Sequence, residues 1–205
     1  RIHSGRCADL MDHETFEQLL EGVRRFVNER LIPLEAKVAE DDAIPADALA
    51  EMRALGMFGI SIPEEYGGLG LSMEEECPTM FEFCRCSPAF RSAFGTNVGI
   101  GSQGLVMFGT QAQKDKWLPG VASGEVVTSF ALTEPEAGSD SASVRTRAER
   151  DGDHYVLNGS KRYITNAARR RFRLPRAQRS QGCVGRQARK ENGAAGRPHS
   201  RCEFR

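Results

Sequence analysis

The apolar residues in the first half of the chain recur at intervals of three and four, which is the period of an amphipathic helix. The clearest example covers residues 14–32, where Phe16, Leu20 and Val23 share one face and charged side chains occupy the other. Proline lacks the amide hydrogen that a helix interior uses. We therefore expect Pro33 to end this first helix.

Shorter helices are predicted further along the chain by their end signals. Residues 46–55 form a helical pattern that Gly56 closes, because glycine tolerates the left-handed backbone found after a helix. Ser72 and Glu75 have the spacing of a capping box, in which each side chain bonds the backbone amide of the other. A further short helix is expected over residues 111–118, ended by the Pro-Gly pair that follows.

From residue 126 the apolar period changes to two, which indicates strands. Asn158 and Gly159 are typical of a type I′ turn between two strands of a hairpin. The expected strands are 126–132, 144–149, 155–157 and 161–165. Helices followed by strands favour an α+β fold, with an all-α helical domain over 14–124 and the first part of an antiparallel β domain over 125–167.

Charge is distributed unevenly over the 205 residues, although the net formal charge is zero. Residues 1–167 carry 16 basic and 26 acidic side chains, whereas residues 168–205 carry 12 basic and two acidic ones. A basic tail of this kind could bind nucleic acid, which makes a non-enzymatic nucleic-acid-binding protein one alternative function. The tail has too few apolar residues to fold around a core. A second interpretation is therefore that it has no evolved function.

The start of the chain, its hydropathy and its cysteines indicate which features the protein lacks. Residues 1–10 have no period and Met11 is the expected natural start, so we treat 1–13 as a disordered leader. No run of about 18 apolar residues occurs, so we expect no membrane span and a cytoplasmic protein. None of the six cysteines and four histidines has the spacing of a zinc site, so no metal is predicted.

Gly99, Gly101 and Gly104 match the G-x-G-x-x-G fingerprint of nicotinamide-dependent enzymes. This fingerprint follows a strand, and residues 88–97 have no clean strand pattern. The acidic residue expected at the end of the next strand is also missing, since Glu125 precedes that strand. A nicotinamide-dependent oxidoreductase is therefore a second alternative function. The other interpretation of these glycines is a helix of small residues that packs closely against its neighbours or lines a ligand pocket.

A polar loop follows the first predicted strand and is the best candidate for a binding site. Pro135 prevents the strand from continuing, and Gly138 permits backbone angles that other residues avoid. Thr133 and Ser139 supply hydroxyl groups, and the amides of residues 137–140 could converge on an anion or a ring edge. An ordinary turn between a strand and a loop would have the same pattern.

Two motifs resemble those of the acyl-CoA dehydrogenase family. Residues 133–140 read Thr-Glu-Pro-Glu-Ala-Gly-Ser-Asp, and residues 161–166 read Lys-Arg-Tyr-Ile-Thr-Asn, with an Asn-Gly pair between them. Each motif alone is a weak signal, but the two together at this interval are specific. The resemblance covers roughly residues 14–167 and implies an FAD-dependent enzyme that dehydrogenates acyl-CoA thioesters between the α and β carbons.

The resemblance also implies roles for particular residues. Thr133 would bond the pyrimidine side of the flavin, Tyr163 would pack on the ring system where the family often has tryptophan, and Thr165 would donate near N5. Ser139 would lie near the pyrophosphate and the mouth of the substrate channel. The implied cofactor-binding residues are Phe130, Leu132, Thr133, Gly138, Ser139, Tyr163 and Thr165, and the implied substrate-binding residues are Ser139, Thr96 and Ile100.

No catalytic residue is assigned, because the base of the family is a carboxylate of a later helical domain and no position here aligns with it. We therefore expect this chain alone not to turn over acyl-CoA. The resemblance further implies electron-transferring flavoprotein as the partner of the intact enzyme, a role in fatty acid metabolism, and homo-oligomeric relatives. Residues 168–205 do not resemble the family, and their content of arginine, alanine, glycine and proline suggests a shifted, GC-rich reading frame.

Overall fold

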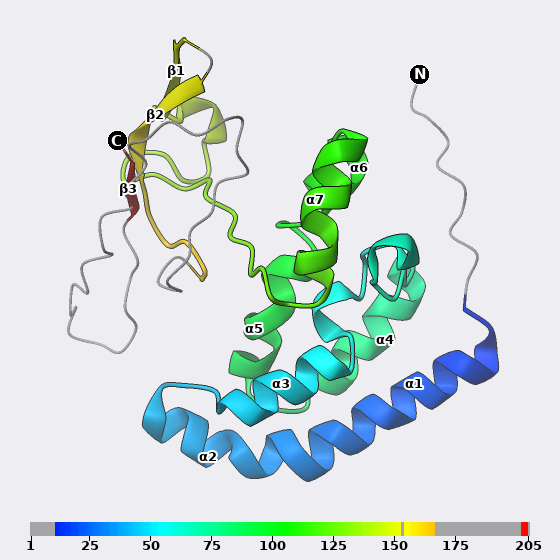
Figure 1. The fold of residues 1–205 in the computed structure, drawn as a ribbon. Coiled ribbons are helices and arrows are strands. Elements are labelled where there is room, and N and C mark those ends of the chain that lie inside the picture. The colour runs from blue at the N-terminus through cyan, green and yellow to red at the C-terminus, as the bar shows by residue number, and fades with distance from the viewer. Residues whose placement is uncertain (1–10, 153, 167–201, 205) are drawn as a thin grey trace. The chain divides into compact units, whose positions relative to one another are not determined.

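The computed structural model describes residues 11–152, 154–166 and 202–204 (Figure 1). The chain divides into two compact units, Arg1–Thr128 and Ser129–Arg205, here called the helical unit and the β unit. Among the described residues, no helix is long and apolar enough to cross a membrane. The predicted α+β fold is confirmed, whereas the predictions for residues 1–10 and for most of 168–205 lie outside the described residues.

The first helix does not end at Pro33. Helix α1 (His13–Phe26) continues through a π-helical turn (Val27–Leu31) into α2 (Ile32–Asp41). The prediction was wrong because the proline lies in the first turn of α2, where its missing amide costs little, and the wider π turn before it absorbs the break in the ladder.

The predicted end signals of the next helices are confirmed. Helix α3 (Ala46–Ala54) is followed by Gly56 with a φ of 74°, and a 3₁₀ turn (Met57–Gly59) comes next. Ser72 and Glu75 form the expected capping box of α4 (Met73–Phe83). A second 3₁₀ turn (Glu64–Tyr66) lies in the loop between α3 and α4.

Helix α7 (Gln111–Ala122) continues past the proline that was expected to end it. Leu118, Val121 and Ala122 are all buried on the same apolar cluster, so packing compensates for the amide that Pro119 lacks. Val126 and Thr128 do not form the predicted strand either. Their backbone groups bond the side chain of buried Asn97 instead. Nδ2 of Asn97 donates to the carbonyl oxygen of Val126 at 2.9 Å, and the amide of Thr128 donates to Oδ1 of Asn97 at 2.8 Å.

The nicotinamide fingerprint is contradicted by the elements around it. A helix, α5 (Pro88–Val98), precedes the three glycines, and the third of them, Gly104, already lies inside a helix of only six residues, α6 (Gln103–Phe108). Gly101 has a packing role, because a Cβ there would lie 2.0 Å from Oγ1 of Thr128 and 2.4 Å from the carbonyl oxygen of Thr96. The strand-turn-helix geometry that a dinucleotide needs is therefore absent from this described segment.

Most of the core of the helical unit is one apolar cluster, which is distinct from the smaller cluster that buries α7. The rings of Phe83 and Phe94 meet edge to face with 5.0 Å between centroids, joining α4 to α5. The largest members of the cluster, all fully buried, include Val23, Val27, Leu31, Met52, Met57, Phe58, Ile60, Phe83, Phe90 and Phe94.

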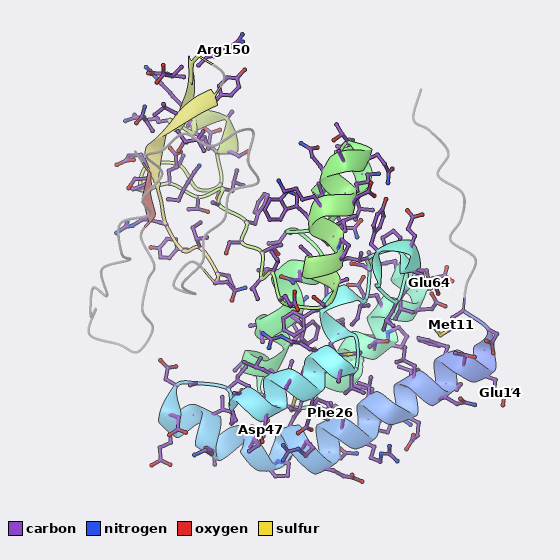
Figure 2. The ribbon with its side chains drawn as sticks, viewed as in Figure 1. Met11, Glu14, Phe26, Asp47, Glu64 and Arg150 are labelled. Carbon is purple, nitrogen blue, oxygen red and sulfur yellow. The ribbon has the colours of Figure 1, made fainter. Side chains whose placement is uncertain are left out.

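The β unit contains a hairpin of β1 (Arg147–Asp151) and β2 (His154–Lys161), and β2 also pairs with β3 (Cys202–Phe204). Its turn is at Gly152, with a φ of 62°, and Arg150 lies beside that turn (Figure 2). The predicted turn at Asn158 and Gly159 is wrong, because both residues lie within β2, where Asn158 pairs with Arg147.

The predicted strand over 161–165 is also wrong beyond Lys161. Tyr163 has a φ of 57° and Asn166 a φ of 66°, and both values leave the extended region that a strand requires. Of the predicted strand over 144–149, only residues from Arg147 onward pair with a partner strand.

Candidate functional site

Two segments of the β unit, 129–134 and 161–166, run antiparallel to one another. The amide of Arg162 donates to the carbonyl oxygen of Thr133 at 2.8 Å, and the hydroxyl of Ser129 donates to the carbonyl oxygen of Thr165 at 2.8 Å. The start of the first motif and the residues just before it therefore lie beside the second motif, more than twenty residues further along the chain.

The carboxylate of Glu134 is buried, with an exposed fraction of 5%, and it is fully engaged. It accepts from the hydroxyl and the amide of Thr146, from the amide of Arg145 at 2.6 Å, and from Nζ of Lys161 at 3.0 Å. The bond from the Thr146 hydroxyl is the largest cause that lowers the pKa of Glu134, to about 2, ahead of the Arg145 amide and Lys161. A carboxylate held ionised in this way is a poor proton acceptor near neutral pH.

Lys161 occupies the last position of β2, and its ammonium group is buried with an exposed residue fraction of 6%. Its Nζ donates to the carbonyl oxygen of Leu132 at 2.9 Å as well as to Glu134. The lysine therefore joins the end of the β hairpin to the backbone of the residue before Thr133 and to the side chain of the residue after it.

The residues implied for the flavin lie around this contact. Phe130 and Leu132 are exposed on the first segment and Tyr163 and Thr165 on the second, with exposed fractions of 48% for Phe130 and 58% for Tyr163. Thr133 between them is half-buried. Exposed aromatic faces next to hydroxyl groups are the chemistry that a planar, partly polar ring system requires.

Some polar groups of the loop over residues 135–140 are already used in local hydrogen bonds. The amide of Ala137 donates to the carbonyl oxygen of Glu134, and the Asp140 carboxylate caps a 3₁₀ turn (Ser141–Ser143). Gly138 is not in the left-handed region, which corrects the role proposed for it in the backbone. A Cβ at Gly138 would meet nothing within 4 Å, so the space beside its backbone is open, and Ser139 next to it is exposed.

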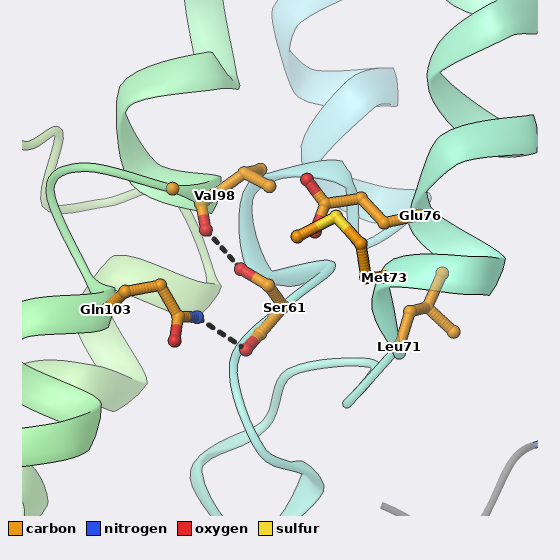
Figure 3. A pocket seen from close by; sticks show the side chains of 7 residues that line it. Ser61, Leu71, Met73, Glu76, Val98 and Gln103 are labelled. Carbon is orange, nitrogen blue, oxygen red and sulfur yellow. Dashed lines mark hydrogen bonds between the residues drawn. The ribbon is translucent and has the colours of Figure 1, made fainter.

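The helical unit has a separate cavity of about 280 Å³, which lies between α4, the end of α5 and α6 (Figure 3). Ser61 donates to the carbonyl oxygen of Val98 at its edge, and Nε2 of Gln103 donates to the carbonyl oxygen of Ser61 at 3.1 Å. Burial raises the pKa of Glu76, and the nearby charge of Arg91 partly offsets that rise. The lining residues are Ser61, Leu71, Met73, Glu76, Val98, Gly99 and Gln103.

Neither residue proposed for the acyl group lines this cavity. Thr96 is buried, and its carbonyl oxygen accepts from the amide of Gly101 at 2.9 Å. Ile100 is exposed at 61%. Their roles toward a substrate stay predictions. Within the part of the chain that the structure describes, no group of three or more His, Cys, Asp or Glu side chains could hold a metal ion.

The pair of Glu134 and Lys161 was missed by the sequence reasoning, which gave neither residue a role of its own. The one available signal was that Lys161 is the single lysine between residues 129 and 166. Pairing across 27 positions depends on the hairpin register, which the sequence had placed at the wrong turn.

Comparisons with known proteins agree with the two motifs. The profile of the acyl-CoA dehydrogenase N-terminal domain matches residues 13–125, and the profile of the middle domain matches residues 129–205. The second match includes the arginine-rich segment, so its assignment to an unrelated tail stays a prediction.

Individual relatives point the same way. The (2S)-methylsuccinyl-CoA dehydrogenase of Cereibacter sphaeroides is 40% identical over 76% of this chain and 28% of its own length. The acyl-CoA dehydrogenase of Bacillus anthracis complexed with FAD is 35% identical, with a TM-score of 0.67 over 76% of this chain and 27% of that chain. A structure of the electron transferring flavoprotein of Acidaminococcus fermentans is 33% identical, with a TM-score of 0.70 over 77% of this chain and 42% of that chain. The chain thus spans less than half the length of these proteins.

Proposed function

Because the chain belongs to the acyl-CoA dehydrogenase family, whose members depend on FAD, we propose that its β unit binds FAD for the α,β-dehydrogenation of an acyl-CoA thioester. The observation that carries this proposal is the antiparallel contact between the segments 129–134 and 161–166. It brings exposed apolar side chains and hydroxyl groups of both segments to one region of the unit.

The residues of this region fit a flavin chemically. FAD, when bound, supplies the acceptor for the hydride that leaves the β carbon. The Thr133 hydroxyl would donate to the pyrimidine side of the ring, where negative charge develops, and Thr165 would donate near N5. Phe130, Leu132 and Tyr163 would cover the ring, and the open space at Gly138 would admit the pyrophosphate beside Ser139.

The proton of the α carbon needs a base that these residues do not supply. Glu134 is held ionised by four hydrogen bonds, and Glu76 lies in the cavity of the helical unit, outside the two motifs. We propose that this 205-residue chain binds FAD but that acyl-CoA does not reduce the bound FAD. For the intact enzyme we propose a carboxylate base from a further helical domain, electron-transferring flavoprotein as the acceptor, and a place in fatty acid metabolism.

The experiment is reconstitution of the purified chain with FAD, followed by anaerobic addition of a series of acyl-CoA thioesters. We expect a stoichiometric yellow complex whose absorbance does not bleach with any thioester. Loss of flavin during gel filtration at micromolar protein would contradict FAD binding, and bleaching by an acyl-CoA would contradict the missing base.

A further inference from the structure

Glu134 and Lys161 form the most buried ion pair among the described residues. Their side chains are exposed by only 3% and 7%, and Nζ lies 3.0 Å from Oε1. Among the described residues of the helical unit, every ion pair has at least one partner exposed by 40% or more. A buried ion pair adds little stability over a well-packed apolar pair, so its value here needs another explanation.

We propose that Glu134 and Lys161 are positioning residues that fix Thr133 in place before a cofactor binds. The ammonium group of Lys161 bonds the carbonyl oxygen of Leu132 at 2.9 Å and the side chain of Glu134 at 3.0 Å, so it holds the residues on both sides of Thr133. The carbonyl oxygen of Thr133 is itself held by the amide of Arg162 at 2.8 Å.

The support for this arrangement comes from the β hairpin. Thr146 and Arg145, immediately before β1, hold the Glu134 carboxylate through two amides and a hydroxyl. Lys161 ends β2, so both partners are attached to the same rigid pair of strands. Groups held by secondary structure keep their geometry better than groups on loops, and a preorganised site loses less entropy on binding.

The positioning claim has a test that needs no cofactor, namely hydrogen exchange at the Arg162 amide followed by NMR. Glu134→Gln leaves the buried charge of Lys161 without a carboxylate partner, which can destabilise the fold. Glu134→Gln combined with Lys161→Met removes both charges and so avoids that cost. In both variants we expect the Arg162 amide to exchange at least about 10-fold faster, because a charge-assisted bond is lost. Exposed Glu136→Gln is the matched control and is expected to leave the rate unchanged.

Amides within β2, such as that of Val156, separate local loosening from global unfolding. We expect them to exchange in the double variant as they do in the wild type. Unchanged exchange at Arg162, or an equal increase at Val156 and Arg162, would overturn the positioning role.

A second measurement connects the pair to the flavin and rests on the proposed function. In the double variant we expect a melting temperature close to that of the wild type but a Kd for FAD raised about 10-fold, since the loop must then be ordered on binding. An unchanged Kd would overturn the inference. Failure of the wild type to bind FAD would instead contradict the proposed function, while the exchange test at Arg162 would still decide the positioning role.

Discussion

Gly159 lies in the middle of β2, and replacing it with alanine tests the packing of the β unit. A Cβ there would lie 2.2 Å from Oγ1, 2.8 Å from Cβ and 2.9 Å from Cγ2 of Thr146. Thr146 cannot turn away freely, because its hydroxyl and amide bond the buried carboxylate of Glu134. Overpacking of this kind costs about 1–3 kcal/mol, and we expect about 2 kcal/mol for Gly159→Ala.

The cost is measured by hydrogen exchange of the β2 amides, which reports the opening of this hairpin. A loss of about 2 kcal/mol corresponds to exchange that is about 30-fold faster. Gly138→Ala is the control, because a Cβ at that position meets nothing within 4 Å, and we expect a change of less than about twofold. In a Thr146→Ala background, which removes two of the three close contacts, the effect of Gly159→Ala should shrink.

Two outcomes would refute this reasoning. If Gly159→Ala and Gly138→Ala change the exchange rates equally, Gly159 is not required for the close approach of Thr146. If the cost of Gly159→Ala is the same in the wild-type and Thr146→Ala backgrounds, the strain has another source.

Three further predictions concern Gly101, Glu134 and the arginine-rich segment 168–205. Gly101→Ala should destabilise the helical unit by about 2 kcal/mol in urea unfolding followed by Trp117 fluorescence, with Gly104→Ala nearly neutral, because only the first new Cβ meets the backbone of Thr96. Since the pKa of Glu134 is lowered from 4.5 to about 2, its stabilising contribution is present above pH 4.5 and is lost as pH falls toward 2. The protection factor of the Arg162 amide, which corrects for the slower intrinsic exchange at low pH, should therefore fall over that window in the wild type and not in Glu134→Gln. If the tail arose from a shifted frame, one alternative frame of the gene after codon 167 should encode alternating apolar residues, and its absence in both frames would favour a nucleic-acid-binding arm.

The helical unit was largely predictable because local signals determine it. The period of residues 14–32 and the capping box of Ser72 and Glu75 depend on side chains within one or two turns, and the structure confirms both. The errors at Pro33 and Pro119 have different causes. Pro33 lies in the first turn of α2, where the missing amide costs little, whereas exposed Pro119 is tolerated because its neighbours Leu118, Val121 and Ala122 are buried.

The β unit was predicted less well because its geometry depends on distant contacts. Asn158 and Gly159 have the composition of a tight turn, yet the glycine is there to let Thr146 approach β2. The two motifs were found from sequence as a resemblance, but the ion pair that joins them links positions 134 and 161, and no local pattern records such a pair. Tyr163 was expected to lie in a strand and to pack on the flavin ring. Its left-handed backbone breaks that strand, and its contact with a flavin stays a prediction.

The most direct test of a flavin site built from these two motifs is an NMR titration of the ¹⁵N-labelled chain with FAD, observing every backbone amide. We predict saturable shifts at residues 130–133, 138–139 and 163–165, with the amides of Gly99 to Gly104 unaffected. Saturable shifts confined to Gly99–Gly104, or no saturable shifts at all, would contradict the account.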